Sequence, residues 1–188
     1  STGTEPWVSN GLPGQDSMIV NTQPGAEGSI NHPNSLSDGI LCYYSVRNRR
    51  LYRTDGTAAG TIELMSDGGF PFELLVFNGY TYLLTVGNPG RLLKTDGTPA
   101  GTTVLIDSIG NYYSGRIMNV FNGRLWIFRK GADNHWGLWR SNNDASAFEL
   151  AVPLNPPGTG SPSYFITHGD HMYFFADDGI NGVQYYQS

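Results

Sequence analysis

The sequence predicts an all-β protein of the β-propeller class, and three observations support this prediction. The segment Leu51–Thr61 returns 41 residues later as Leu92–Thr102, and both copies contain an Asp-Gly-Thr turn. A repeat of this length is typical of stacked copies of one small supersecondary unit. Short runs rich in β-branched and aromatic residues alternate with glycine-containing turns, and no stretch has useful helical periodicity. Each unit contains four such runs, which we name strands A to D in chain order.

Strand C is the most regular element of the repeat. Its aromatic or leucine position is spaced by 45, 41, 46 and 47 residues along the chain. Narrow but uneven spacing is what loop insertions into a fixed unit produce. The five copies of strand C are residues 6–10, 51–55, 92–96, 138–142 and 185–188.

Strands A and B are joined by short turns, most of them Asn-Gly or Asp-Gly. These dipeptides between β-rich runs are strong hairpin signals, because both central residues tolerate positive φ. The turns predict strand B at residues 40–44, 80–84, 124–128 and 171–175. Strand D follows strand C at residues 17–21, 61–65, 102–106 and 148–152.

Four short antiparallel strands in each repeat, repeated about four times, describe a propeller with four blades of four strands. We expect one domain over residues 1–188, closed by pairing of the N- and C-terminal strands. Its units are approximately 1–21 plus 164–188, 29–66, 72–107 and 116–152. A solenoid of hairpins and a sandwich are the alternatives. The sandwich fits less well, because it gives no reason for one turn motif to recur at a fixed phase.

Strand C occurs once more often than strands A, B and D. The surplus copy can add as an outer strand, displace the N-terminal copy or pair with a neighbouring molecule. We favour closure within the chain, which leaves a monomer without exposed sheet edges. A homo-oligomer held by strand exchange is the alternative.

The Asp-Gly-Thr turn that joins strands C and D has a structural interpretation. Its aspartate can accept a hydrogen bond from the backbone two residues on, and its glycine permits positive φ. The same turn recurs where only geometry is shared, so we do not assign it to a ligand site.

The repeat also resembles a known bacterial family. Residues 3–11 read Gly-x-Glu-Pro-Trp-x-x-Asn-Gly, and residues 52–61 and 93–102 contain Thr-Asp-Gly-Thr-x-Ala-Gly-Thr. These segments resemble the ELW-x-x-DGT repeat of secreted and cell-surface proteins. The resemblance implies a propeller-like fold and an extracellular or cell-surface location, and it carries no catalytic residues. The fourth unit departs from the pattern, with Asn142-Asn143-Asp144 in place of the Asp-Gly-Thr turn.

Composition and missing motifs narrow the function classes. The net charge is −5, and the 11 Lys and Arg residues are scattered, which argues against a nucleic-acid partner. No apolar stretch is long enough for a membrane-spanning helix, and a single cysteine allows no intramolecular disulfide. Nucleophile-elbow, phosphate-loop and His-Glu-x-x-His motifs are missing, so we expect no enzyme. A propeller glycoside hydrolase or lyase is the less favoured alternative, and its paired carboxylates would come from Asp133, Asp177 and Asp178.

The irregular loops between strands B and C and between D and A share one face of such a propeller. They are rich in aromatic, Asn, Asp and Gly residues, which can stack on sugar rings and bind hydroxyl groups. We therefore expect a non-catalytic, lectin-like binding module for a glycan or a protein. The stacking candidates are Phe72, Tyr112, Tyr113 and Trp136, and the polar candidates are Asn111, Asp133 and Asn134. The competing interpretation is that these aromatic residues fill the contacts between blades.

Two alternatives remain open at this point. A structural or adhesive surface protein would self-associate or polymerise through the surplus strand. A calcium site is the weak metal candidate, formed by Asp177, Asp178 and Asn181 at the start of a loop that lacks the remaining EF-hand ligands. A hairpin turn between strands B and C explains the same residues better, and we predict no cofactor.

Overall fold

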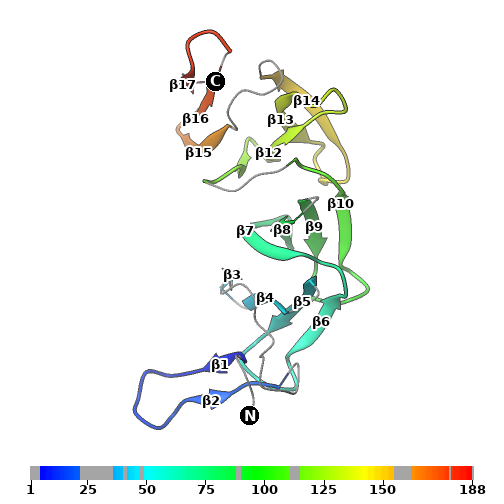
Figure 1. The fold of residues 1–188 in the computed structure, drawn as a ribbon, viewed down its shortest axis with the longest axis vertical. Coiled ribbons are helices and arrows are strands. Elements are labelled where there is room, and N and C mark those ends of the chain that lie inside the picture. Colours follow the sequence, from blue (N-terminus) through cyan, green and yellow to red (C-terminus); the bar gives the residue numbers. More distant parts are fainter. Residues whose placement is uncertain are drawn as a thin grey trace. The chain divides into compact units, whose positions relative to one another are not determined.

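The computed structural model describes residues 5–21, 36–39, 42–46, 49–87, 90–110, 115–154, 162–177 and 179–187. Its described part consists of β-strands and turns without an α-helix, which confirms the predicted all-β class. The strands form five small sheets, and within each sheet every strand is hydrogen-bonded to the strands next to it in sequence (Figure 1).

Three of the sheets have four strands each, and they match the predicted A–B–C–D order. The first of them contains β3 (Leu36–Ser37), β4 (Cys42–Val46), β5 (Arg50–Thr54) and β6 (Ile62–Met65). The second contains β7 (Phe70–Phe77), β8 (Tyr80–Val86), β9 (Arg91–Thr95) and β10 (Thr103–Ile106). The third contains β11 (Met118–Phe121), β12 (Arg124–Lys130), β13 (Trp136–Ser141) and β14 (Phe148–Pro153).

The two remaining sheets are incomplete in the part that the structure describes. Strands C and D of the N-terminal unit form β1 (Trp7–Val8) and β2 (Ser17–Met18), which pair only with each other. Strands A to C of the C-terminal unit form β15 (Ser163–His168), β16 (His171–Asp177) and β17 (Val183–Gln187).

The predicted ring of four complete blades, closed by pairing of the terminal strands, is therefore wrong for the described strands. They form five sheets, and no pair joins β1 or β2 to β15, β16 or β17. Pairing between strands that are consecutive in sequence is favoured over pairing of the two chain ends, because closing a short hairpin loop costs less chain entropy than bringing distant segments together.

The chain divides into two compact units, residues 1–87 with 93–104 and residues 88–92 with 105–188. The predicted single domain with its four boundaries stays a prediction.

In the first unit, two consecutive sheets share one hydrophobic core. Tyr43, Leu51 and Leu64 come from the sheet β3–β6, and Leu83 and Leu93 come from the sheet β7–β10. All five side chains are almost completely buried. The face of the sheet β3–β6 that carries Tyr43 and Leu51 is therefore covered by the opposite face of the sheet β7–β10.

In the second unit, aromatic rings make the equivalent contact. The ring of Phe128 on β12 lies with its centroid 5.3 Å from that of Phe165 on β15 and 5.2 Å from that of Phe174 on β16. A backbone bond from Phe165 N to Arg116 O, 3.0 Å long, adds to this contact. The sheet β15–β17 thus packs one face on the sheet β11–β14.

The Asp-Gly-Thr turns bear out their structural interpretation. Asp55 Oδ1 accepts hydrogen bonds from Thr57 N (2.9 Å) and Thr57 Oγ1 (2.7 Å), and Gly56 has φ +91°. The Thr57 hydroxyl in turn accepts a bond from Gly60 N (2.9 Å). A Cβ atom on Gly60 would overlap the Asp55 carboxylate, so the second glycine of the motif is required by packing.

The second copy of the turn has the same geometry. Asp96 Oδ1 accepts bonds from Thr98 N (2.8 Å) and Thr98 Oγ1 (2.7 Å), and Gly101 N donates to Thr98 Oγ1 (3.0 Å). Hydrogen bonds from the threonine hydroxyl and backbone lower the pKa of Asp55 and of Asp96 below the ordinary value of 3.8. Both carboxylates are therefore occupied in holding the chain reversal.

Candidate functional site

A hollow of about 490 Å³ lies at the end of the sheet β11–β14 where strand A turns into B and strand C turns into D. We name it the Arg124 hollow. Arg124 opens β12, and the other lining residues, Asn142, Asn143 and Asp144, follow β13 directly. This is the unit in which the sequence departs from the Asp-Gly-Thr turn.

The turn that forms one wall is held by the Asn142 side chain. Asn142 Oδ1 accepts hydrogen bonds from Ser146 N (2.9 Å) and Ala147 N (3.1 Å), and its Nδ2 donates to Ser146 Oγ (2.9 Å). A backbone bond from Asn142 N to Ala147 O, 2.9 Å long, closes the loop. The amide therefore fixes the backbone from residue 142 to residue 147.

The same turn keeps the chemistry of the Asp-Gly-Thr motif two residues further along. Asp144 Oδ1 accepts bonds from Ser146 N (3.1 Å) and Ser146 Oγ (2.8 Å), as Asp55 does from Thr57. Ala145 takes the place of glycine, with φ +54°. The turn has the same length as its counterpart, because Arg140 pairs with Glu149 as Arg53 pairs with Ile62. Asn142-Asn143-Asp144 therefore replaces Asp-Gly-Thr without an insertion, and the aspartate–serine bonds lie two residues further along the same turn.

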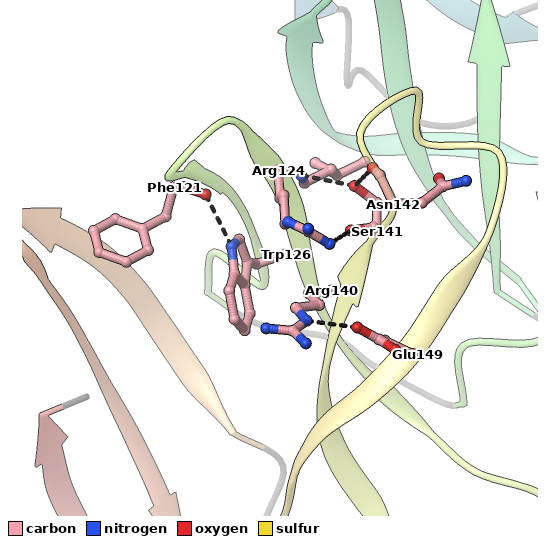
Figure 2. A network of polar contacts seen from close by, with 8 residues as sticks. Phe121, Arg124, Trp126, Arg140, Ser141, Asn142 and Glu149 are labelled. Atoms are coloured by element: carbon pink, nitrogen blue, oxygen red, sulfur yellow. Dashed lines mark hydrogen bonds and ion pairs between the residues drawn. The ribbon is translucent and has the colours of Figure 1, made fainter.

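Arg124 also lines the hollow and is hydrogen-bonded to the sheet. Its Nη1 donates to Ser141 O (3.1 Å), as Figure 2 shows. The buried Ser141 hydroxyl accepts a bond from Leu125 N (3.0 Å) and donates to Asn142 O (2.7 Å). A guanidinium has five N–H donors, and this bond uses one of them, so Arg124 can also donate to a ligand.

Two further contacts stabilise the sheet behind the hollow (Figure 2). Trp126 Nε1 donates to Phe121 O at 3.0 Å, which connects strand B to the end of strand A. Arg140 Nε donates to Glu149 Oε1 at 2.7 Å across β13 and β14. The residues that line the hollow therefore belong to a sheet that side-chain contacts between its strands stabilise.

The lining combines a guanidinium, two amides and one carboxylate. Asn142, Asn143 and Asp144 are exposed, and Arg124 is partly buried. Amide and carboxylate groups hydrogen-bond to hydroxyl groups as donors and acceptors, and a guanidinium adds directional donors. The arrangement can hold a small polar ligand rich in hydroxyl groups.

The structure brings three of the predicted loop residues together at the other end of the same sheet. Asp133, Asn134 and Trp136 belong to the hairpin between β12 and β13. Asp133 Oδ1 accepts a bond from His135 N (3.1 Å), and Asn134 Oδ1 accepts one from Lys130 Nζ (3.1 Å). Lys130 Nζ lies 5.7 Å from the centre of the Trp136 ring, and Trp136 is only 6% exposed.

The other predicted residues are not part of this hairpin. Phe72 is partly buried on β7, in the other compact unit. Asn111, Tyr112 and Tyr113 lie outside the described residues. A ligand role for the predicted set stays a prediction.

The weak metal candidate forms a hairpin turn, as the sequence analysis preferred. β16 and β17 pair from Asp177 with Val183, and Asp177 Oδ1 accepts a bond from Gly179 N (2.8 Å). Asn181 O accepts one from Gln184 Nε2 (3.0 Å), and Asp178 lies outside the described residues. Across the described ranges, no three His, Cys, Asp or Glu side chains come together as metal ligands. Those ranges also contain no helix with the length and apolarity that crossing a bilayer requires.

Sequence reasoning missed the residues that line the Arg124 hollow. The available signal was the interruption of a repeated turn, which we treated only as a departure from the family pattern. A changed turn in a rigid repeat is a common place for function, because loops vary without changing the scaffold. The up-and-down order of strands places this turn at the opposite end of the sheet from the B–C loops that the sequence favoured.

No protein-family model and no curated protein matches the sequence. Solved structures of propeller proteins resemble it. A puromycin hydrolase mutant complexed with PGG aligns at 12% identity and a TM-score of 0.52, over 78% of this chain and 24% of that chain. BamB from Moraxella catarrhalis aligns at 13% identity and a TM-score of 0.44, over 82% of this chain and 42% of its own. A chain of a nidogen/laminin complex aligns at 16% identity and a TM-score of 0.49, over 92% and 64%.

At these identities the likeness shows the fold alone. The chain is all-β and propeller-like, and it spans about a quarter of the length of the puromycin hydrolase chain, 24%.

Proposed function

We propose that the chain is a non-catalytic, propeller-type binding module that holds a hydroxyl-rich ligand, such as a carbohydrate, in the Arg124 hollow. The observation that carries the proposal is the polar lining of this hollow, built where one unit has Asn142-Asn143-Asp144 in place of the Asp-Gly-Thr turn. The turns between β5 and β6 and between β9 and β10 keep the Asp-Gly-Thr sequence and its closed set of hydrogen bonds.

Preorganisation supports the proposal. Asn142 and Asp144 hold the turn through bonds to Ser146, and Arg124 is tethered to Ser141 O. Side chains that are already fixed lose little conformational entropy when a ligand binds. The further N–H donors of the Arg124 guanidinium are suited to the oxygens of vicinal hydroxyl groups.

A binding role fits the lining better than hydrolysis of a glycoside. Among the described residues, the lining contains one carboxylate, Asp144, and that group accepts two hydrogen bonds from Ser146. Glycoside hydrolases of the usual kind use two carboxyl groups, about 5–10 Å apart. We also propose an extracellular or cell-surface location, because of the resemblance to the ELW-x-x-DGT repeat.

A glycan array followed by calorimetric titration of each hit tests the proposal. We expect Arg124→Ala and Asn143→Ala each to weaken binding of the same glycan at least tenfold, about 1.4 kcal/mol. Arg140→Ala is the matched control, because Arg140 lies on the same sheet and pairs with Glu149 outside the lining. We expect this control to bind like the wild type.

Two results would contradict the proposal. One is an array without hits. The other is a hit whose affinity depends on Asp133 and Asn134 but not on Arg124, which would place the site at the β12–β13 hairpin.

A further inference from the structure

The outer face of the sheet β15–β17 exposes aromatic side chains that other sheets bury. Phe175 is 38% exposed, Tyr185 is 55% exposed and Tyr164 is 62% exposed. Tyr173 stacks on Tyr185 with ring centroids 5.7 Å apart, and Phe175 lies 5.2 Å from Tyr185. Tyr164 meets Phe175 edge-on at 6.1 Å. We name these four residues the aromatic face.

Strand register identifies the counterparts of the aromatic face in the preceding sheet. Phe175 pairs with Tyr185 as Phe128 pairs with Leu138. Phe128 and Leu138 are both fully buried, with 0% exposure. Equivalent positions are therefore covered in the sheet β11–β14 and open in the sheet β15–β17.

The side chains that cover such a face come from the opposite face of another sheet. Phe165 and Phe174 cover Phe128 in the second unit. In the first unit, Leu93 packs in the cluster that contains Tyr43 and Leu51. An occupant of the aromatic face should therefore present a large apolar residue at the strand C position that Leu93 occupies.

Trp7 is such a residue, and it is exposed. It occupies the Leu93 position of its own repeat, and it is 60% exposed on β1. Its neighbour Val8 points to the other side of the strand, because successive side chains of a strand alternate between faces. Val8 Cγ2 would lie 3.7 Å from a Cβ placed on Gly56, so the Val8 side is directed at the following sheet. The Trp7 side chain therefore lies on the face of β1 that points away from the following sheet, β3–β6.

We propose that the aromatic face binds the Trp7 side of β1–β2 in a second copy of this chain. The contact repeats the sheet-on-sheet packing already present inside each compact unit. It joins two different surfaces, so it is heterologous, and a bound pair still offers one free surface of each kind. Aromatic residues at the centre of an interface commonly contribute most of its binding energy.

Sedimentation velocity of the full chain over a wide concentration range is the first test. We expect mass to increase with concentration. Trp7→Ser and Tyr185→Ser should each weaken association by about 30-fold or more, as expected for an aromatic hot spot. Val76→Ser is the matched control, because Val76 is similarly exposed, at 52%, on β7. We expect it to associate like the wild type.

Mixing the two variants tests the heterologous geometry. Trp7→Ser retains an intact aromatic face, and Tyr185→Ser retains an intact Trp7. The mixture should therefore form dimers that grow no further, although each variant alone stays monomeric. Circular dichroism should show that both variants remain folded, since both side chains are exposed.

Several results would overturn the proposal. They are a wild type that is monomeric at every concentration, a Trp7→Ser variant that associates like the wild type, and a mixture that forms no dimer. The proposal would also be overturned if Tyr185→Ser lost association while Trp7→Ser kept it, because the occupant of the aromatic face would then be something other than Trp7.

Discussion

Replacing Phe128 with leucine tests the packing between consecutive sheets on which the fold depends. The Phe128 ring is fully buried and contacts Phe165 at 5.3 Å and Phe174 at 5.2 Å between centroids. An aromatic pair stabilises by about 0.5–1.5 kcal/mol beyond its area burial, so losing two pairs costs about 1–3 kcal/mol. The smaller side chain leaves a void on the order of 25 Å³, which adds about 0.6 kcal/mol at about 24 cal/mol per Å³. We expect the free energy of unfolding to fall by about 1.6–3.6 kcal/mol in total.

Urea unfolding followed by circular dichroism measures this change. A double-mutant cycle with Phe165→Leu isolates the contact between the sheets, and we expect a coupling energy of about 0.5–1.5 kcal/mol. Phe148→Leu is the control, because Phe148 lies on β14 of the same sheet, is partly exposed and has no ring partner among the described residues. Its effect should stay within about 0.5 kcal/mol.

A coupling energy of zero between Phe128 and Phe165 would refute this reasoning. It would mean that the sheet β15–β17 does not pack on the sheet β11–β14 in solution. The assignment of the aromatic face would then lose its basis, because that face is defined by its equivalence to the Phe128 face.

Three further predictions concern turns and buried polar groups. Gly60→Ala should lower the thermal midpoint of unfolding, because the new Cβ collides with the Asp55 carboxylate. Asp55→Ala should lower the midpoint less in the Gly60→Ala background than in the wild type, because it removes that collision. Strictly additive changes in the midpoint would contradict this. The lowered pKa values of Asp55 and Asp96 mean that the folded chain resists protonation, so their stabilisation is complete above the ordinary pKa of 3.8 and is lost as the pH falls through the folded values. The double variant Asp55→Asn/Asp96→Asn should accordingly show a flatter stability profile below that pH in acid titrations. Tyr43→Phe should destabilise by about 1–2 kcal/mol in urea, because the buried hydroxyl donates to Asp38 at 2.8 Å and lies 3.2 Å from the Thr81 hydroxyl. Burial raises the pKa of Tyr43 to about 12, so the wild type should lose this advantage only as the pH rises from 10.0 towards that value.

The local order of strands and turns was predictable from the sequence. Asn78-Gly79 and Asn122-Gly123 have positive φ, as the A–B hairpins require. The bonds of Asp55 to Thr57 and of Asp96 to Thr98 follow from residues two apart in sequence. Such features depend on a few neighbouring residues, which is why pattern reasoning recovers them.

The candidate site was less predictable for a physical reason. The Asn142 amide reaches Ser146 and Ala147, and Arg124 reaches Ser141 from the neighbouring strand. Direct alignment located the replaced turn correctly, because Arg140 pairs with Glu149 as Arg53 pairs with Ile62. It could not show which side chains hold that turn, because this is decided by bonds that form only in the folded chain.

Phe128 and Phe175 show most clearly what the tertiary structure alone decides. Both are phenylalanines at equivalent positions of strand B, and alternation places both on the same face of their sheets. One is 0% exposed and the other is 38% exposed. Residue type and periodicity determined that each face is apolar. Whether another sheet covers that face depends on contacts between segments distant in sequence, and these arise only when the sheets pack.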